Sequence, residues 1–100
     1  MTIQKNRDGN KLEIKLEGKL TAITAPDLEK ELADAEKDVD EVVIDMENLD
    51  HVASAGLRTL LTLQKRIRKK NGRMIICKVK PEIRDIFEVT GLTDLLKIEE

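Results

Sequence analysis

The hydrophobic residues near the start of the chain recur at every second position, which predicts a strand. In Lys11–Glu17, KLEIKLE, leucine or isoleucine alternates strictly with charged residues. This pattern is typical of a strand with one buried face and one wet face. A weaker strand is predicted over Thr2–Lys5, and the Asp8-Gly9 pair between the two favours a tight turn. We therefore expect an antiparallel hairpin.

Two later segments carry consecutive apolar residues, without the wet alternate face of the hairpin. They are Glu41–Met46, EVVIDM, and Arg73–Val79, RMIICKV. Such runs are typical of strands that lie inside a parallel sheet. The first of them should be central, and a short last strand is expected over Leu95–Ile98.

Three segments repeat their apolar residues at helical spacing. They are a helix opening at Thr24–Asp27 with Leu28, Leu32 and Ala35 as its buried stripe, a longest helix from about Ala55 to Lys70, and a third helix over Pro81–Thr90. Thr24 is a candidate cap for the first helix, and Pro26 suits its first turn. Asn71-Gly72 and Gly91 supply the stops of the other two.

The resulting order is ββαβαβαβ, which predicts a single-domain α/β fold over residues 1–100. Strand-helix-strand units cross over right-handed, so the sheet should be mixed but mostly parallel. The wet face of the hairpin indicates helices gathered largely on one side. Binding sites in such sheets lie at the carboxyl ends of the strands. Two loops, Lys19–Thr24 and Asn48–Ala55, are expected there together.

Composition excludes several classes of function. The net charge is -2 and Phe87 is the only aromatic residue, which argues against a nucleic-acid-binding protein. Cys77 is the only cysteine, so no disulfide forms within the chain. The stretch MTIQKNRDGNK at residues 1–11 lacks the apolar core that a signal peptide has, and no apolar run approaches the roughly eighteen residues needed to cross a bilayer. We expect a cytoplasmic protein without membrane insertion. His51 lacks companion ligands for a metal, and no cofactor is expected.

Ser54 stands where a strand-like run gives way to the longest helix, and its hydroxyl has three possible roles. It could cap the helix, a contribution of about 1 kcal/mol. It could be a nucleophile, since Val52–Gly56 approaches the G-x-S-x-G elbow of hydrolases, but with valine at the first glycine. Asp50 and His51 are suitable partners by type, yet they precede the serine, whereas that class has them after it.

The third role is acceptance of a phosphoryl group. A phosphate on Ser54 would bring a charge of about -1.5 to -2 to the positive end of a helix. Unpaired backbone N-H groups stabilise anions at this position. A partner that had packed a neutral surface over the loop would have to bury that charge. A loss of about 2 to 5 kcal/mol at the contact lowers affinity roughly thirtyfold to several-thousandfold. Phosphorylation would therefore act as a switch.

Three stretches together resemble the STAS domain, as found in bacterial anti-sigma-factor antagonists. They are GKLTAITAPDLEKEL, VVIDMENLDHVASAGLRTLL and PEIRDIFEVTGLTDLLKI. Their specific parts are G-x-L-x-x-x-T-A, S-x-G-L at the start of the longest helix, and T-G-L near the end, in the family's order and spacing. The resemblance covers nearly the whole chain.

The resemblance implies a partner-switching regulator rather than an enzyme. The unmodified protein would bind an anti-sigma factor that is also a serine kinase. Phosphorylation of Ser54, which falls on the family's modified serine, would release that partner, and a metal-dependent PP2C-type phosphatase would restore it. The docking surface implied by similarity consists of Thr21, Ala22, Thr24, His51, Ala53, Ser54, Ala55, Gly56, Leu57 and Arg58.

The chain departs from the family pattern at two positions of this surface. The family usually has aspartate directly before the serine, where this chain has Ala53, and often has aspartate in the earlier loop, where this chain has Thr21. Both missing charges bear on the same site. They motivate an alternative, a STAS-type adaptor subunit that is not phosphorylated and docks on the ATPase of a membrane lipid-transport complex.

Overall fold

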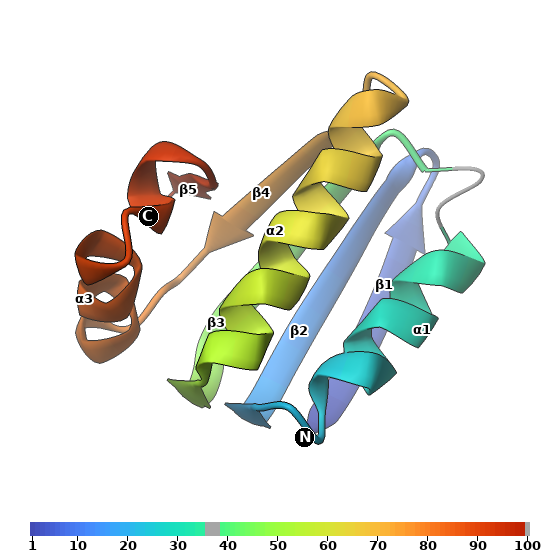
Figure 1. Ribbon diagram of the computed structural model, residues 1–100. Coiled ribbons are helices and arrows are strands. Elements are labelled where there is room, and N and C mark those ends of the chain that lie inside the picture. Colours follow the sequence, from blue (N-terminus) through green and yellow to red (C-terminus); the bar gives the residue numbers. More distant parts are fainter. Residues whose placement is uncertain (36–38, 100) are drawn as a thin grey trace.

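A five-stranded sheet organises the chain (Figure 1). The computed structural model describes residues 1–35 and 39–99, except for the side chains of residues 34 and 35. The strands are β1 (Thr2–Asp8), β2 (Lys11–Leu20), β3 (Glu41–Val52), β4 (Arg73–Cys77) and β5 (Lys97–Glu99). The helices are α1 (Ala25–Ala35), α2 (Ser54–Lys69) and α3 (Pro81–Val89), followed by the short 3-10 helix η2 (Leu92–Asp94). This confirms the predicted α/β order.

The strands lie in the sheet in the order in which they occur along the chain, β1-β2-β3-β4-β5. β1 and β2 are antiparallel, and every later pair is parallel, as predicted. Asp8 pairs with Lys11 across a turn at Gly9 and Asn10. Gly9 has a φ of 61°, in the left-handed region that glycine adopts readily. The Asp-Gly signal for a hairpin is therefore confirmed.

β3 continues to Val52, although the apolar run in the sequence predicts its end at Met46. The pairing of β2 with β3 shifts register twice, between Lys15 and Glu17 and again between Gly18 and Lys19. At each shift β3 contains one more residue than β2, which is the signature of a β-bulge. The bulges break the period of two, so this part of the strand resembles a loop in the sequence.

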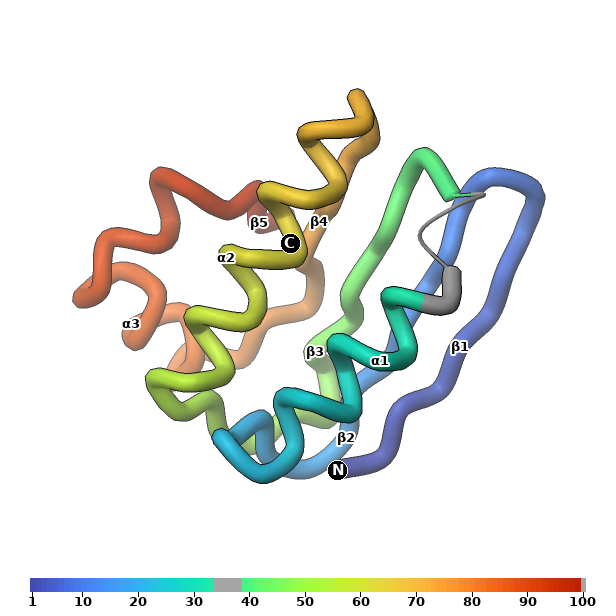
Figure 2. The backbone as a smooth tube through the Cα atoms, turned by 45° about the vertical axis from the view of Figure 1, so that its right-hand side comes forward, coloured from blue at the N-terminus to red at the C-terminus, as the bar shows by residue number. Residues whose placement is uncertain are grey.

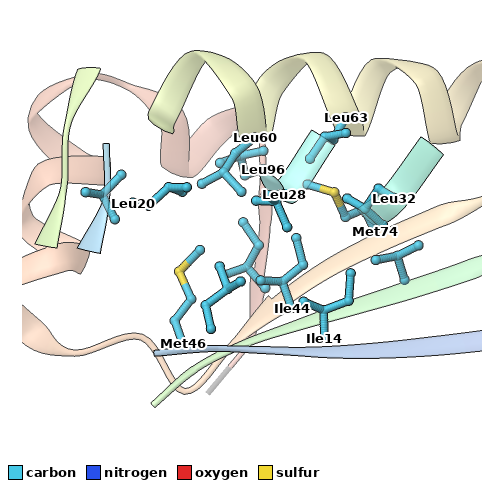
Figure 3. Close-up of a cluster of buried hydrophobic side chains, with 14 of the residues drawn as sticks. Ile14, Leu20, Leu28, Leu32, Ile44, Met46, Leu60, Leu63, Met74 and Leu96 are labelled. Carbon is cyan, nitrogen blue, oxygen red and sulfur yellow. The ribbon is translucent and has the colours of Figure 1, made fainter. Parts of the chain in front are cut away.

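α1 and α2 lie side by side over one face of the sheet (Figures 1 and 2). Leu28 and Leu32 of α1 are buried, as predicted, and Ala35 lies outside the described side chains. Figure 3 shows Leu60 and Leu63 of α2 pointing toward the strands from above. An aliphatic core therefore fills the space between this helical layer and the sheet.

The second face of the sheet is less covered than the sequence predicts. Val43 and Cys77 are only half-buried, although their strands read as buried on both faces. The reason is that α1 and α2 cover one face only (Figure 1). α3 lies beside β4 at the far side of the sheet from β1, with Ile83 and Phe87 buried in the common core. The helices are thus gathered largely on one side, as predicted.

Candidate functional site

The ends of β2 and β3 lie side by side and bring two loops together (Figure 1). Leu20 pairs with Val52, and the backbone N-H of Ala53 donates a hydrogen bond to the carbonyl of Leu20 over 2.8 Å. A Cβ at Gly56 would lie 2.7 Å from Cγ of Leu20 and 3.0 Å from its carbonyl oxygen. Only glycine allows the first turn of α2 to approach β2 this closely. The predicted meeting of Lys19–Thr24 with the Ser54 loop is therefore confirmed.

The loop between β2 and α1 is fixed by its own hydroxyl groups. Oγ1 of Thr24 accepts a hydrogen bond from the Thr21 N-H and donates one to the Lys19 carbonyl, both over 2.8 Å. Oγ1 of Thr21 accepts one from the Ile23 N-H over 3.2 Å. The prediction that the Thr24 side chain caps α1 is wrong, because its hydroxyl bonds back into the loop. The Thr24 carbonyl instead receives the Asp27 N-H.

This loop presents an apolar side chain that the sequence reasoning missed. Ile23 is 86% exposed, an unusual setting for isoleucine. It lies between Ala22 and Thr24, two members of the predicted docking surface. The available signal was a large apolar residue inside a short loop, where no buried stripe accounts for it.

Ser54 is the first residue of α2 and is exposed. The N-cap position belongs to Ala53, with φ -88° and ψ 170°, and no side chain caps the helix. The interpretation of Ser54 as the cap is therefore wrong by one position. The first turn also contains no acidic residue. The positive end of the helix dipole is left without an anionic partner from its own first turn, next to an accessible hydroxyl.

Asp50 and Lys80 form an ion pair near this loop. Nζ of Lys80 donates a hydrogen bond to Oδ1 of Asp50 over 2.8 Å. This hydrogen bond and the charge of Lys80 lower the pKa of Asp50 below its ordinary value of 3.8, and Lys19 adds a smaller effect. Lys80 is also the N-cap residue of α3, so the pair joins the end of β3 to the start of that helix.

The same pair engages the carboxylate that the hydrolase hypothesis would use as the acid of a triad. Asp50 is bonded to Lys80, and no hydrogen bond among the described residues joins it to His51. His51 is exposed and makes no described hydrogen bond to Ser54. A nucleophilic serine needs a base within hydrogen-bond reach, held in turn by an acid. The three residues are close in the sequence but do not form a triad in this structure.

The predicted surface residues separate into three levels of exposure. Ala22, His51, Ser54 and Arg58 are exposed, Thr21, Thr24, Ala53 and Ala55 are half-buried, and Gly56 and Leu57 are buried. The structure thus brings all of them to one edge of the sheet, with the last two lying beneath the others. Their contact with a partner stays a prediction.

The described part of the chain contains neither a cluster of metal ligands nor a helix suited to span a membrane. No group of three or more His, Cys, Asp or Glu side chains gathers there in a way that could hold a metal ion. Within the same residues, none of the helices combines the length and apolarity that crossing a bilayer requires.

The STAS domain family model matches residues 2–100. The chain belongs to the STAS domain family. Among similar sequences, BtrV of Bordetella bronchiseptica, named as a candidate anti-sigma factor antagonist, is 36% identical over 84 residues, covering 83% of this chain and 72% of BtrV. The anti-sigma-B factor antagonist of Staphylococcus aureus is 30% identical over 89 residues, covering 88% of this chain and 82% of that protein.

Solved structures agree on the STAS fold. The anti-sigma factor antagonist SpoIIAA in its unphosphorylated form superposes with a TM-score of 0.85 at 20% identity, covering 99% of this chain and 89% of that one. The phosphorylated form of SpoIIAA, from Bacillus, gives a TM-score of 0.78 over 99% of this chain and 92% of that chain. The resemblance predicted from three sequence stretches is confirmed.

Proposed function

We propose that this STAS protein is an anti-sigma-factor antagonist whose binding is switched by phosphorylation of Ser54. The unmodified protein binds an anti-sigma factor that is also a serine kinase, and a PP2C-type phosphatase restores it. All three act in the cytoplasm. The exposed hydroxyl at the uncapped start of α2 carries this proposal. The names of relatives that are 30% and 36% identical support the class of partner.

The surroundings of Ser54 are suited to a phosphate. Neither Ala53 nor any residue in the first turn of α2 brings a negative charge that would repel it. Free N-H groups and the helix dipole stabilise an anion at this position. Because Ser54 is exposed and is not part of the core, a dianion there leaves the packing of the fold unchanged.

The surface around the serine is suited to a partner. Ile23 offers an exposed apolar side chain, and exposed Ala22 lies next to it. A few side chains packed near the centre of an interface contribute most of its binding energy. A dianion introduced beside such a contact must be desolvated or must separate the two proteins.

Phosphorylation tests the first step. The full chain is incubated with its cognate anti-sigma kinase and ATP, and intact mass and site mapping follow. We expect one added phosphate, on Ser54, and none on the Ser54→Ala variant. Absence of the phosphate, or a phosphate on another residue, would refute the proposal.

Binding of charge variants tests the switch itself. Ser54→Asp should bind the anti-sigma factor roughly thirtyfold or more weakly than the wild type, whereas Ser54→Ala should bind persistently in the presence of ATP. Asn71→Asp is the matched control, since it adds the same charge just beyond the other end of α2. Calorimetric titration gives the affinities. Equal affinities for Ser54→Asp and Asn71→Asp would contradict local electrostatic control.

A second candidate function rests on the uncharged loops. Thr21 and Ala53 are uncharged at two positions of the docking surface where the family often has aspartate, and Ile23 is exposed beside them. A surface of this kind also suits a constitutive adaptor on a transporter ATPase. Purification of the tagged Ser54→Ala variant from its source cell distinguishes the two, because a small kinase supports the first function and a transporter ATPase the second.

A further inference from the structure

A groove lies at the opposite end of α2, away from Ser54. It has a volume of about 310 Å³ and runs between the last turns of α2, the start of β4 and the segment from η2 to β5. Figures 1 and 2 show this end of α2 beside the start of β4. The 16 residues of α2 span roughly 24 Å at about 1.5 Å per residue. The groove is therefore separate from the proposed phosphorylation site.

Gln64 lines this groove, and its amide has no hydrogen-bond partner among the described residues. Its side chain is only 8% exposed. Buried polar groups are nearly always hydrogen-bonded, and an unsatisfied one lowers stability. The amide is therefore available for a hydrogen bond with a molecule that enters the groove.

Positive charge gathers at the same groove. Arg68 lies one turn after Gln64 on the same face of α2, and Arg73 lies at the start of β4. Neither guanidinium forms an ion pair with a described residue. Lys97 also lines the groove, but its Nζ is 3.8 Å from Oε1 of Glu99. Asp94 contributes one negative charge. The two arginines thus leave the groove cationic in a chain whose net charge is -2.

The walls of the groove are partly apolar. Met74 and Leu96 are buried beside it, and Leu95 is 55% exposed on its rim. The volume lies at the lower end of the roughly 300 to 1,000 Å³ that small-molecule sites occupy. A flat protein surface could not reach an amide as buried as that of Gln64, whereas a small molecule can.

We propose that this groove binds a phosphate monoester with a small apolar group. Arginine guanidinium groups hold a phosphate through paired, charge-assisted hydrogen bonds. The amide of Gln64 donates a further hydrogen bond, and Met74, Leu95 and Leu96 contact the apolar group. This site is independent of the function proposed above, because no residue of the Ser54 surface belongs to it.

The test is an NMR titration of the full chain with phenyl phosphate at constant ionic strength. We expect saturable shifts at residues 72–75 and 94–96. Arg68→Gln and Gln64→Met should each weaken binding about tenfold or more. Arg66→Gln, which removes the same charge from a neighbouring residue that does not line the groove, should weaken it less than about threefold. Phenol should not bind, and inorganic phosphate should bind more weakly than phenyl phosphate.

The stability of Gln64→Met without ligand gives a second readout. Because the amide lacks a partner, its replacement should leave the midpoint of thermal unfolding unchanged or raise it. A lowered midpoint would mean that the amide is already satisfied, and would overturn the proposal. Absence of saturable shifts would overturn it too, as would equal losses of affinity for Arg66→Gln and Arg68→Gln, which indicate only diffuse attraction to a basic surface.

Discussion

At the scale of single residues, the proposed switch depends on one position in a helix. Ser54 stands at the first helical residue and Ala53 occupies the cap. An N-cap hydroxyl would point at the backbone N-H groups and be engaged by them. One residue later, the hydroxyl is exposed, and a phosphate added to it would stay close to the same N-H groups. The displacement by one residue therefore favours modification over capping.

The pair of Asp50 and Lys80 gives a residue-scale prediction about pH. The pKa of Asp50 is lowered in the folded protein, so the pair stabilises the fold fully above the ordinary value of 3.8. That contribution is lost as pH falls through the lowered pKa. We expect Lys80→Met to raise the pKa of Asp50 toward the ordinary value, as measured by NMR titration of the side-chain carboxyl.

Lys78→Met is the control for this measurement. Lys78 forms its ion pairs with Asp45 and Glu47, both at 3.5 Å, and not with Asp50. Its removal should leave the pKa of Asp50 where it is in the wild type. Equal pKa values for Asp50 in the wild type and in Lys80→Met would show that the pair does not persist in solution.

At the scale of elements, the close approach of α2 to β2 holds the site together. We expect Gly56→Ala to destabilise the protein by about 1 to 3 kcal/mol, because the new Cβ overlaps Leu20 and the packing must shift. The backbone amide signals of Thr21 and Ser54 should shift with it. Chemical denaturation and NMR spectra measure the two effects.

Gly9→Ala separates this effect from a general loss of glycine. Gly9 lies in the hairpin turn, with a φ of +61° and nothing within 4 Å of an added Cβ. Its substitution should cost about 1 to 2 kcal/mol through the left-handed backbone, without shifts at Thr21 or Ser54. Unchanged amide signals in Gly56→Ala would contradict the account of how the two loops are held.

The sequence predicts the elements well where the period is regular and poorly where the backbone departs from it. The alternation in Lys11–Glu17 and the helical spacing of α2 are visible because a regular backbone returns side chains to the same face at a fixed period, two residues in a strand and about 3.6 in a helix. The end of β3 is hidden, since two bulges reset the alternation after Met46. Bulges depend on pairing with β2, which no local pattern records.

The candidate site shows the same division between local and nonlocal information. The edge at which Lys19–Thr24 meets the Ser54 loop follows from strand order alone and is predicted correctly. The direction of the Thr24 hydroxyl is not predicted correctly. The helix N-H groups and the loop backbone compete for this hydroxyl, and the loop backbone binds it. The exposure of Ile23 likewise depends on the path of the loop, and a sequence period cannot give it.

At the scale of the whole molecule, the proposed switch requires that the packing of the core is the same with and without a phosphate on Ser54. One core cluster joins side chains of all three helices to the inner face of the sheet. Domains of this size unfold cooperatively, with a total stability of about 5 to 15 kcal/mol. A charge added at the exposed Ser54 removes no core contact, so both states of the switch should share one packed interior.

Phe87 tests whether the C-terminal segment belongs to that single cooperative unit. It is fully buried in α3 and is the only aromatic residue of the chain. We expect Phe87→Ala to lower the free energy of unfolding by about 3 to 5 kcal/mol, while Val89→Ala, at a site 87% exposed on the same helix, changes it by less than about 0.5 kcal/mol. In Phe87→Ala, hydrogen exchange should accelerate equally in α3 and in the central residues of β2. Both belong to one core cluster, so a lower free energy of unfolding exposes their backbone amides together. Acceleration confined to α3 would show instead that the segment unfolds as a separate unit, and that the sheet carrying the switch is stable without it.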